Sequence, residues 1–373
     1  MALVTSHVGH ELDELEARLD PRLLRALDMV APGTGLREGI DGIIHARTGG
    51  LILLADPDDV SFLLSGGIKI DVDYNPALLY QLAKMDGAIV LDAEATRILW
   101  ANVQLMPDPT ILSMETGTRH RTAERVSKQT KALVVAISQR RDIVSLYVEG
   151  MKYILVDIPT VLSKANQGLA TLEKYRNHLD RISTRLSERE RQGAVTLHDA
   201  LAVLQRAELV TRMAAEVERY IIELGSEGRL IEMQLEETAM GVMSERTALV
   251  RDYIGVEEEP ELERALADLA ALPYRELLDF GRLAEVLGYD RKANPHDLTV
   301  VPRGYRALAE IPRLPRLVAQ KLVQRFGDLE GIMAASEAEL AAVDGVGEER
   351  AAEVRAGLSR LWEVGFVDRY TST

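Results

Sequence analysis

Hydrophobic and polar positions alternate in two different ways along the chain. Up to about residue 150, short apolar runs are separated by turn-forming residues, which is the pattern of buried strands. The strands predicted in this way cover residues 49–55, 86–92, 97–105, 132–138 and 143–148. Leucines at helical spacing predict a helix over 11–30, and Asn75 followed by Pro76 predicts the cap and first turn of another helix over 75–84. Strands mixed with helices indicate an α/β domain with a mixed sheet.

After Pro159 the spacing becomes helical. Apolar residues recur at steps of three, four and seven between Leu162 and Leu186, close to a heptad stripe. Gly193 ends this helix, and Thr196-Leu-His-Asp199 resembles a capping box that opens the next one, which runs to Leu224. A third long helix is predicted over 230–253. These helices form a bundle or a spacer without evident chemistry.

The C-terminal part contains a weak internal repeat. Residues 311–315 form a short loop before a helix over 316–326, and residues 343–347 form another before a helix over 348–361. Glycines at 345 and 347 allow backbone N–H groups to approach a phosphate without a Cβ in the way.

These patterns predict a multidomain chain. An N-terminal α/β domain covers residues 1–155, a central all-α helical spine covers 156–302, and an all-α domain with tandem helical hairpins covers 303–373. The length of 373 residues fits two or three domains, and 47% hydrophobic content is enough for sizeable cores. The chain has no cysteine, which excludes disulfides and cysteine-bound metals. No apolar run is long enough for a membrane span, and the N-terminus lacks a signal-like core, so we expect a soluble cytoplasmic protein.

Charge is distributed unevenly. The formal net charge of −15 argues against nucleic acid coating the whole surface. Yet the segment 117–141 holds seven Lys or Arg residues and one acid, Glu124. A turn at residues 117–118 and a helix over 122–131 would place the triplet Arg119-His-Arg121 near a helix N-terminus, where N–H groups and the helix dipole favour phosphate. On charge alone, an exposed basic helix paired with acids elsewhere is an equal alternative.

The second C-terminal loop, Val343-Asp-Gly-Val-Gly347, resembles the helix-hairpin-helix family, which grips the DNA backbone without reading sequence. The resemblance implies DNA contacts from Gly345, Val346, Gly347 and Arg350. The first loop has prolines where glycines are usual, so whether it touches DNA stays open. Positive and negative charges nearly balance in this domain, so we expect weak, backbone-directed binding. The alternative is a helical cap that binds protein.

Two motifs in the N-terminal domain carry a second resemblance. Asp86-Gly-Ala88 alone is a common turn, but Thr118-Arg-His-Arg-Thr122 follows it later in the chain. In this order the motifs resemble the diadenylate cyclase catalytic domain, and residues 49–54, 126–130 and 136–139 extend the match. With its helical middle and hairpin tail, the whole chain resembles the bacterial DNA integrity scanning family. It has no P-loop motif, so it is not a P-loop ATPase.

This resemblance implies an enzyme that joins two ATP molecules into cyclic di-AMP, releases two pyrophosphates and uses Mg²⁺ or Mn²⁺. It implies Asp86 as the catalytic carboxylate, which binds the metal together with ATP phosphates or accepts the proton of the 3′-hydroxyl. The ATP-binding residues that it implies are Gly87, Ala88, Leu105, Thr118, Arg119, His120, Arg121, Thr122, Ser138 and Arg141. Considered alone, Leu105 is more simply an ordinary core residue.

The family also implies partners. Two cyclase domains must face each other, so a homo-oligomer, an octamer in this family, is expected, and branched DNA bound to the tail is expected to modulate activity. The competing interpretation is a DNA-binding scaffold whose N-terminal domain senses a nucleotide without turning it over, and the intact motifs speak against it. A nuclease or glycosylase would need a clustered acidic metal site near the hairpins, and Asp344 is more simply a turn residue.

Overall fold

The structure, a computed structural model, describes residues 20–139, 143–255 and 258–371, and beyond residue 360 it describes the backbone only. The chain divides into two compact units. The first contains residues 1–169 and 215–235, and the second contains residues 170–214 and 236–373.

The first unit is built on an eight-stranded mixed sheet, with the strand order β2-β5-β4-β1-β6-β7-β8 and with β3 paired to β5. The strands are β1 (Gly50–Leu54), β2 (Leu64–Ser65), β3 (Ile68–Asp73), β4 (Ala88–Leu91), β5 (Arg97–Leu105), β6 (Leu133–Ile137), β7 (Val144–Val148) and β8 (Met151–Ile154). Strands β1 and β4 are parallel, and the other pairings are antiparallel. The predicted fold class is confirmed. Strands β2, β3 and β8 were not predicted, because β2 is short and much of β3 and β8 is exposed, which leaves no apolar run to find.

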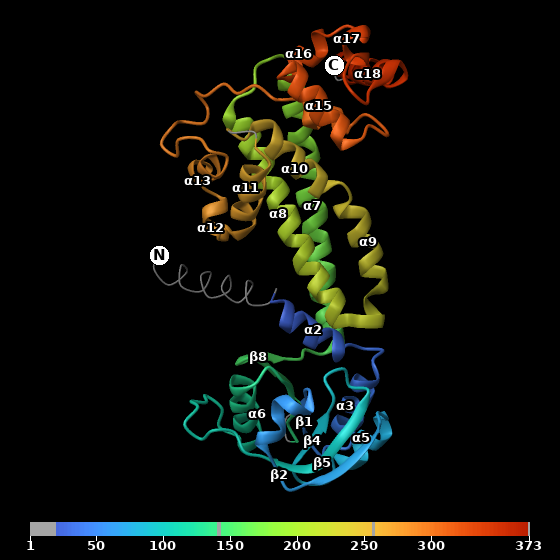
Figure 1. Ribbon diagram of the computed structural model, residues 1–373, viewed down its shortest axis with the longest axis vertical. Coiled ribbons are helices and arrows are strands. Elements are labelled where there is room, and N and C mark those ends of the chain that lie inside the picture. Colours follow the sequence, from blue (N-terminus) through green and yellow to red (C-terminus); the bar gives the residue numbers. More distant parts are fainter. Residues whose placement is uncertain (1–19, 140–142, 256–257, 372–373) are drawn as a thin grey trace. The chain divides into compact units, whose positions relative to one another are not determined.

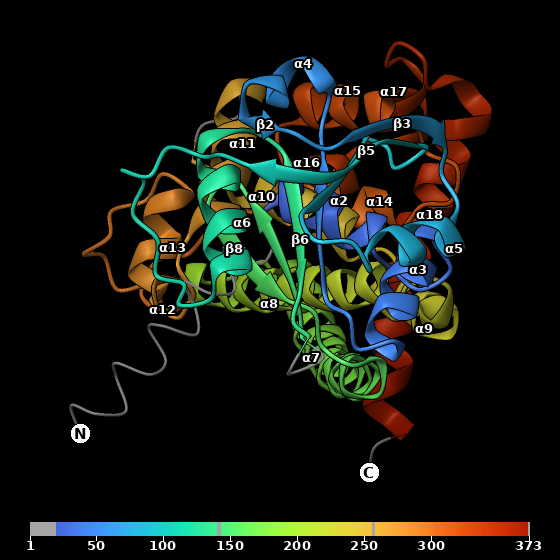
Figure 2. The same cartoon turned by 90° about the horizontal axis from the view of Figure 1, so that it is seen from below.

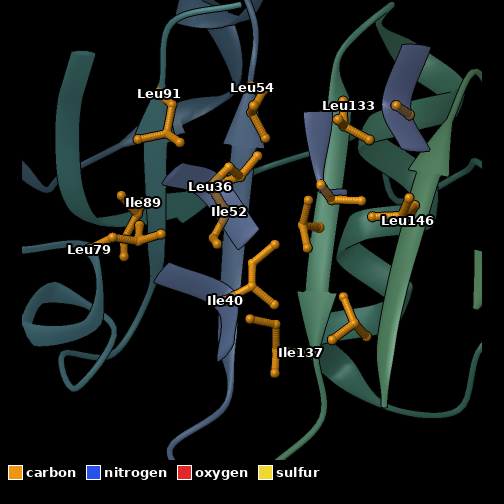
Figure 3. Close-up of a cluster of buried hydrophobic side chains, with 14 of the residues drawn as sticks. Leu36, Ile40, Ile52, Leu54, Leu79, Ile89, Leu91, Leu133, Ile137 and Leu146 are labelled. Atoms are coloured by element: carbon orange, nitrogen blue, oxygen red, sulfur yellow. The ribbon is translucent and has the colours of Figure 1, made fainter. Parts of the chain in front are cut away.

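Helices cover both faces of this sheet (Figures 1 and 2). One face packs against α2 (Pro21–Met29), α3 (Gly35–His45) and α5 (Pro76–Leu82), and the other against α6 (Thr118–Gln129). Alternate residues of β1 therefore enter different cores: Ile52 and Leu54 face α3 in the cluster of Figure 3, whereas Leu51 and Leu53 lie in the core that contains residues of α6. Burial on both faces explains why the central strands are continuously apolar.

Local signals set several helix ends. The Asn75 side chain accepts hydrogen bonds from the N–H groups of Ala77 and Leu78 at 2.9 and 3.2 Å, as its predicted capping role requires. The predicted start of the basic helix at residue 122 was wrong. Helix α6 begins at Thr118, with the Arg121 N–H donating to the Gly117 carbonyl at 2.8 Å. The basic triplet therefore lies inside the first turn of α6 instead of before it.

Helices make up most of the remaining residues that the structure describes. They are α7 (Ile158–Arg191), α8 (Leu197–Leu224), α9 (Arg229–Ala239), α10 (Val242–Tyr253), α11 (Glu259–Ala271), α12 (Tyr274–Leu277) and α13 (Phe280–Val286). The capping box is confirmed, because the Thr196 N–H donates to the Asp199 carboxylate at 3.0 Å and the Asp199 N–H approaches the Thr196 hydroxyl at 3.4 Å. The single helix predicted over 230–253 was wrong. Gly241, with φ of +79°, divides it into α9 and α10.

The tail packs within the second unit around its own apolar core. Its helices are α14 (Tyr305–Ala309), α15 (Arg316–Phe326), α16 (Leu329–Ala334), α17 (Glu337–Ala341) and α18 (Gly347–Thr371). The buried carboxylate of Asp252, on α10, accepts hydrogen bonds from the N–H groups of residues 304, 305 and 306 at 2.6 to 2.9 Å. Arg306 donates to Glu190 of α7 at 2.7 Å. These buried contacts attach the first tail helix to the end of the spine.

Candidate functional site

The register of the sheet brings most of the predicted nucleotide-site residues to one edge. Strand β4 runs parallel to β1 with Ile52 opposite Ile89, so the starts of both strands are level. Strand β6 is antiparallel, with Gly50 opposite Ile137, so its end lies at the same edge. Strand β5 is antiparallel to β4 and also ends there. This edge therefore carries the predicted residues Asp86, Gly87, Ala88, Leu105 and Ser138.

The first turn of α6 reaches this edge through Arg119. One guanidinium nitrogen of Arg119 (Nη1) donates to the Ile137 carbonyl at 3.2 Å. Gly49, with φ of +68°, lies directly beneath it, and a Cβ on this residue would be 2.5 Å from the same nitrogen. Gly49 was not predicted as a site residue. Its signal was the pair Gly49-Gly50 at the start of β1, where the missing side chain leaves room for the Arg119 guanidinium.

Asp86 and Gly87 form the turn that leads into β4. Asp86 is exposed, and its carboxylate has no hydrogen-bond or ion-pair partner among the residues that the structure describes. Gly87 has φ of +93°, and a Cβ there would lie 2.8 Å from the Val103 carbonyl oxygen. Only glycine fits this position, and the exposed Asp86 side chain beside it is open to a ligand.

The other predicted nucleotide-site residues differ in exposure. Thr118 is exposed, and Thr122 and Ser138 are half-buried. Leu105 is buried in the core on the α6 side of the sheet and is paired with Leu64 of β2, so it is a core residue at the edge of the site. Arg141 lies outside the described residues.

Part of the basic segment stabilises the loop of residues 106–117. Arg125 donates to the Ile111 carbonyl and Lys128 to the Leu112 carbonyl, both at 2.9 Å. Arg121 donates at 3.3 Å to carbonyls of the same loop. The later turns of α6 are therefore paired mainly with carbonyls of this loop, and not with acids elsewhere as the alternative had it, whereas the first turn reaches the edge of the sheet through Arg119.

Glu124 anchors the same loop from the buried side of α6. It accepts hydrogen bonds from the Ser113 hydroxyl at 2.5 Å and from the Met114 N–H at 3.1 Å, and it pairs with Lys128 at 2.6 Å. Burial alone would raise the pKa of Glu124, but the hydrogen bonds from Lys128 and Ser113 outweigh it, so the pKa is lowered and the carboxylate stays charged.

The edge suits a metal that arrives with its ligand. Within the described ranges there is no group of three or more His, Asp or Glu side chains placed to hold a metal ion. Asp86 offers a single open carboxylate. Mg²⁺ is commonly bound by one or two carboxylates together with substrate phosphates, and the open carboxylate of Asp86 at this edge fits that arrangement.

The second hairpin of the tail has the geometry of an open backbone loop. Gly345 and Gly347 have φ of +85° and +67°, and the buried Val346 donates its N–H to the Val343 carbonyl at 3.0 Å. A Cβ at Gly347 would meet no protein atom within 4 Å, so the loop is accessible from outside. Arg350 donates at 2.7 Å to the Gly345 carbonyl, which stabilises the loop and keeps a cation beside it.

The first hairpin adopts the same kind of turn with other residues. Arg313 has φ of +61°, matching Gly345, and the Leu314 N–H donates to the Ile311 carbonyl at 3.3 Å, matching Val346 and Val343. Pro315 occupies the place of Gly347 and has no N–H to offer a phosphate. The two hairpins therefore share the turn up to Leu314 and Val346, but they diverge at the next residue, where Pro315 has φ of −65° and Gly347 has φ of +67°.

Family models match successive parts of the chain. The nucleotide-binding domain of the DisA bacterial checkpoint controller matches residues 37–152, its linker region matches 155–295, and a helix-hairpin-helix motif matches 307–362. Fold and site together define a class: multidomain proteins in which a mixed-sheet nucleotide-binding domain and a helix-hairpin-helix tail share one chain.

Full-length relatives define the family within this class. The DNA integrity scanning protein DisA of Carboxydothermus hydrogenoformans is 51% identical over 346 residues, which cover 92% of this chain and 98% of that protein. The DisA proteins of Frankia alni and Streptomyces avermitilis are 48% and 47% identical, over 92% and 93% of this chain and 96% and 94% of theirs. The chain belongs to the DisA family of DNA integrity scanning proteins. None of the helices in the described part of the chain has the length and apolar character needed to cross a bilayer.

Proposed function

We propose that the chain is a diadenylate cyclase that converts two ATP molecules into cyclic di-AMP and two pyrophosphates. In each of two equivalent steps, a 3′-hydroxyl oxygen forms a bond to the α-phosphorus of the other nucleotide. The bond between that phosphorus and the pyrophosphate oxygen breaks, and the hydroxyl proton is released. Such phosphoryl chemistry depends mainly on positioning and on neutralising charge, with little covalent participation by the protein.

The observation that carries this proposal is that an open carboxylate and a phosphate-binding turn share one edge of the sheet. Asp86 precedes β4, and Arg119 of α6 contacts the end of β6, while β1 lies between these two strands. Adjacent strands are about 4.8 Å apart, so β4 and β6, the strands at which these two residues lie, are separated by about 10 Å. In our proposal Asp86 attracts the proton of the 3′-hydroxyl, and Thr118, Arg119, His120, Arg121 and Thr122 hold the triphosphate.

Each domain offers one such edge, so the reaction requires a second copy of the chain to present the other nucleotide. Two large apolar side chains in the loop that precedes α6 support such a contact, since Leu112 and Met114 are 86% and 92% exposed. We therefore propose a homo-oligomer of at least two copies, and the octamer remains what the family resemblance implies. A bound Mg²⁺ or Mn²⁺ would neutralise phosphate charge beside Asp86.

The tail adds DNA binding to the proposal. The open loop with Gly345 and Gly347 supports contacts from backbone N–H groups to DNA phosphates, with Arg350 beside it. Backbone contacts favour DNA shape over sequence, which suits branched DNA. We propose that DNA held in this way changes the facing geometry of the cyclase domains and thereby their rate, because misplacement by about 1 Å can cost about 100-fold.

The test compares the wild-type chain with Asp86→Asn and with Asp58→Asn as a matched control. Asp58 is also an exposed carboxylate, and it follows β1 at the opposite edge of the sheet. Each protein is incubated with ATP and Mg²⁺ or Mn²⁺, the product is identified by mass spectrometry, and ATP binding is measured by titration calorimetry. We expect cyclic di-AMP from the wild type and from Asp58→Asn.

We expect Asp86→Asn to bind ATP but to form almost no product. Retained turnover in this variant would remove Asp86 from its role. ATP binding without cyclic di-AMP from the wild type under any of these conditions would instead favour a nucleotide-sensing scaffold.

A further inference from the structure

Behind the first turn of α6, the Glu115 carboxylate is fixed by two strands. Its Oε1 atom accepts a hydrogen bond from the Tyr147 hydroxyl of β7 at 2.9 Å and pairs with the Lys152 ammonium of β8 at 2.5 Å. Tyr147 is fully buried, so Glu115 satisfies a hydroxyl that would otherwise be costly inside the core. A segment of loop is thus attached to the sheet by a charged residue rather than by apolar packing.

The same residue reaches the proposed triphosphate site in two ways. Its backbone carbonyl accepts a hydrogen bond from Arg121 Nε at 3.3 Å, so the loop orients that guanidinium. Its side-chain partner Tyr147 lies edge-on to the imidazole of His120, with ring centroids 6.4 Å apart and an interplanar angle of 74°. Glu115 therefore connects the sheet to two of the three residues in the basic triplet.

Glu115 is charged in this setting. Burial would raise the pKa of Glu115, but the hydrogen bonds from Lys152 and Tyr147 and the charges of Lys152 and His120 outweigh burial, so the pKa is lowered. The Glu115 carboxylate is only 18% exposed and is already paired with Lys152 and Tyr147, so it is not open to a metal. Its role therefore differs from that of the exposed Asp86.

We propose that Glu115, held by Tyr147 and Lys152, is a positioning residue that orders the loop and the first turn of α6 for the triphosphate end of the nucleotide. This inference rests on the proposed function and extends it to residues that touch no substrate atom. When the contacts of Glu115 with Tyr147 and Lys152 are removed, Arg121 and His120 keep their chemistry but lose their fixed orientation. Binding then has to include the ordering of both side chains.

The test uses the full chain with Glu115→Gln, Tyr147→Phe and the double variant. Gln retains an acceptor for Tyr147 but loses the ion pair with Lys152, and Phe keeps the buried ring but loses the hydroxyl. The control is Glu94→Gln, which removes a carboxylate from another ion pair of the same unit, with Arg25. The KM for ATP and kcat are measured by product formation, and ATP affinity is measured by calorimetry.

We expect Glu115→Gln to raise the KM and the Kd for ATP about tenfold, while kcat stays within a few-fold of the wild-type value. We expect Tyr147→Phe to weaken ATP binding as well. In the double variant the loss of ATP affinity should be less than the sum of the two single losses, because both changes remove the same contact between Glu115 and Tyr147. The thermal unfolding midpoint without ATP is expected to fall more in Glu115→Gln than in Glu94→Gln, because Glu115 is 18% exposed whereas Glu94 is 64% exposed, and exposed ion pairs contribute little to stability.

Unchanged ATP affinity in Glu115→Gln would overturn the proposal, and so would an equal loss of affinity in Glu94→Gln. If the wild type binds ATP without forming cyclic di-AMP, the proposed function fails, and the calorimetric comparison of the variants still decides whether Glu115 positions the site.

Discussion

Gly49 offers a sharp test of the nucleotide site, because one methyl group there would displace Arg119. In Gly49→Ala the added Cβ would lie 2.5 Å from Arg119 Nη1 and 3.0 Å from the Ile137 carbonyl oxygen. Real carbon atoms do not approach a nitrogen so closely. The guanidinium must therefore leave the position in which it donates to Ile137 at 3.2 Å.

Two separate effects follow. The left-handed backbone at Gly49, with φ of +68°, costs an alanine about 1–2 kcal/mol of folding stability. Displacing Arg119 removes a charged hydrogen-bond donor from the proposed phosphate site, and such bonds contribute about 1.5–3 kcal/mol. Since about 1.4 kcal/mol is tenfold in affinity, ATP binding should weaken by about 10- to 100-fold.

Gly66→Ala separates the two effects. Gly66 has φ of +66°, and a Cβ there would meet no atom within 4 Å, so this variant carries the backbone strain without the clash. Urea unfolding should show a loss of stability in both variants, larger in Gly49→Ala because of its contacts with Arg119 and Ile137, and titration calorimetry should show weakened ATP binding in Gly49→Ala alone. Equal ATP affinity in the two variants would refute the reasoning that places Arg119 at the phosphates.

Two further predictions concern the second unit. Gly347→Ala puts a methyl group where a DNA phosphate would approach. Gel shifts with branched DNA should therefore show about tenfold weaker binding, the equivalent of one lost hydrogen bond. The control Gly327→Ala, which is also at positive φ in open space, should bind DNA normally. Burial, followed by the charge of Glu190, raises the pKa of Asp252 from 3.8 to about 7, so the folded state retains a proton that the unfolded chain releases. The free energy of unfolding should therefore fall as the pH rises from about 4 to about 7, and Asp252→Asn should flatten this slope in urea titrations at several pH values; an unchanged slope would contradict the assignment.

Much of the architecture was predictable because its causes are local. The central strands are buried on both faces, so each is a continuous apolar run that stands out in the sequence. The Asn75 cap and the Thr196–Asp199 capping box depend on contacts within three residues, which makes them readable without a fold. The same holds for the helix break at Gly193.

Other features escaped prediction because distant partners create them. Most of β3 is exposed, and the strand exists because β5 supplies its hydrogen bonds. The helix break at Gly241 occurs inside an otherwise helical pattern. Glu115 is one acid among many in the sequence, and its significance appears only when β7 and β8 bring Tyr147 and Lys152 to it.

By itself, the sequence determined the identity of the chemical groups. These are one carboxylate in the Asp86 turn, a cationic triplet at residues 119–121, and glycines at 49 and 87, where a Cβ would clash with Arg119 and Val103. The tertiary structure decided which of them act together. The strand register, set by hydrogen bonds between segments far apart in the chain, brings Asp86, Gly49 and the end of β6 to one edge. The packing of α6 against the loop that precedes it pairs Arg125 and Lys128 with carbonyls of that loop. Charge along a sequence is one-dimensional, whereas the pairing of charges depends on distances that only the folded chain defines.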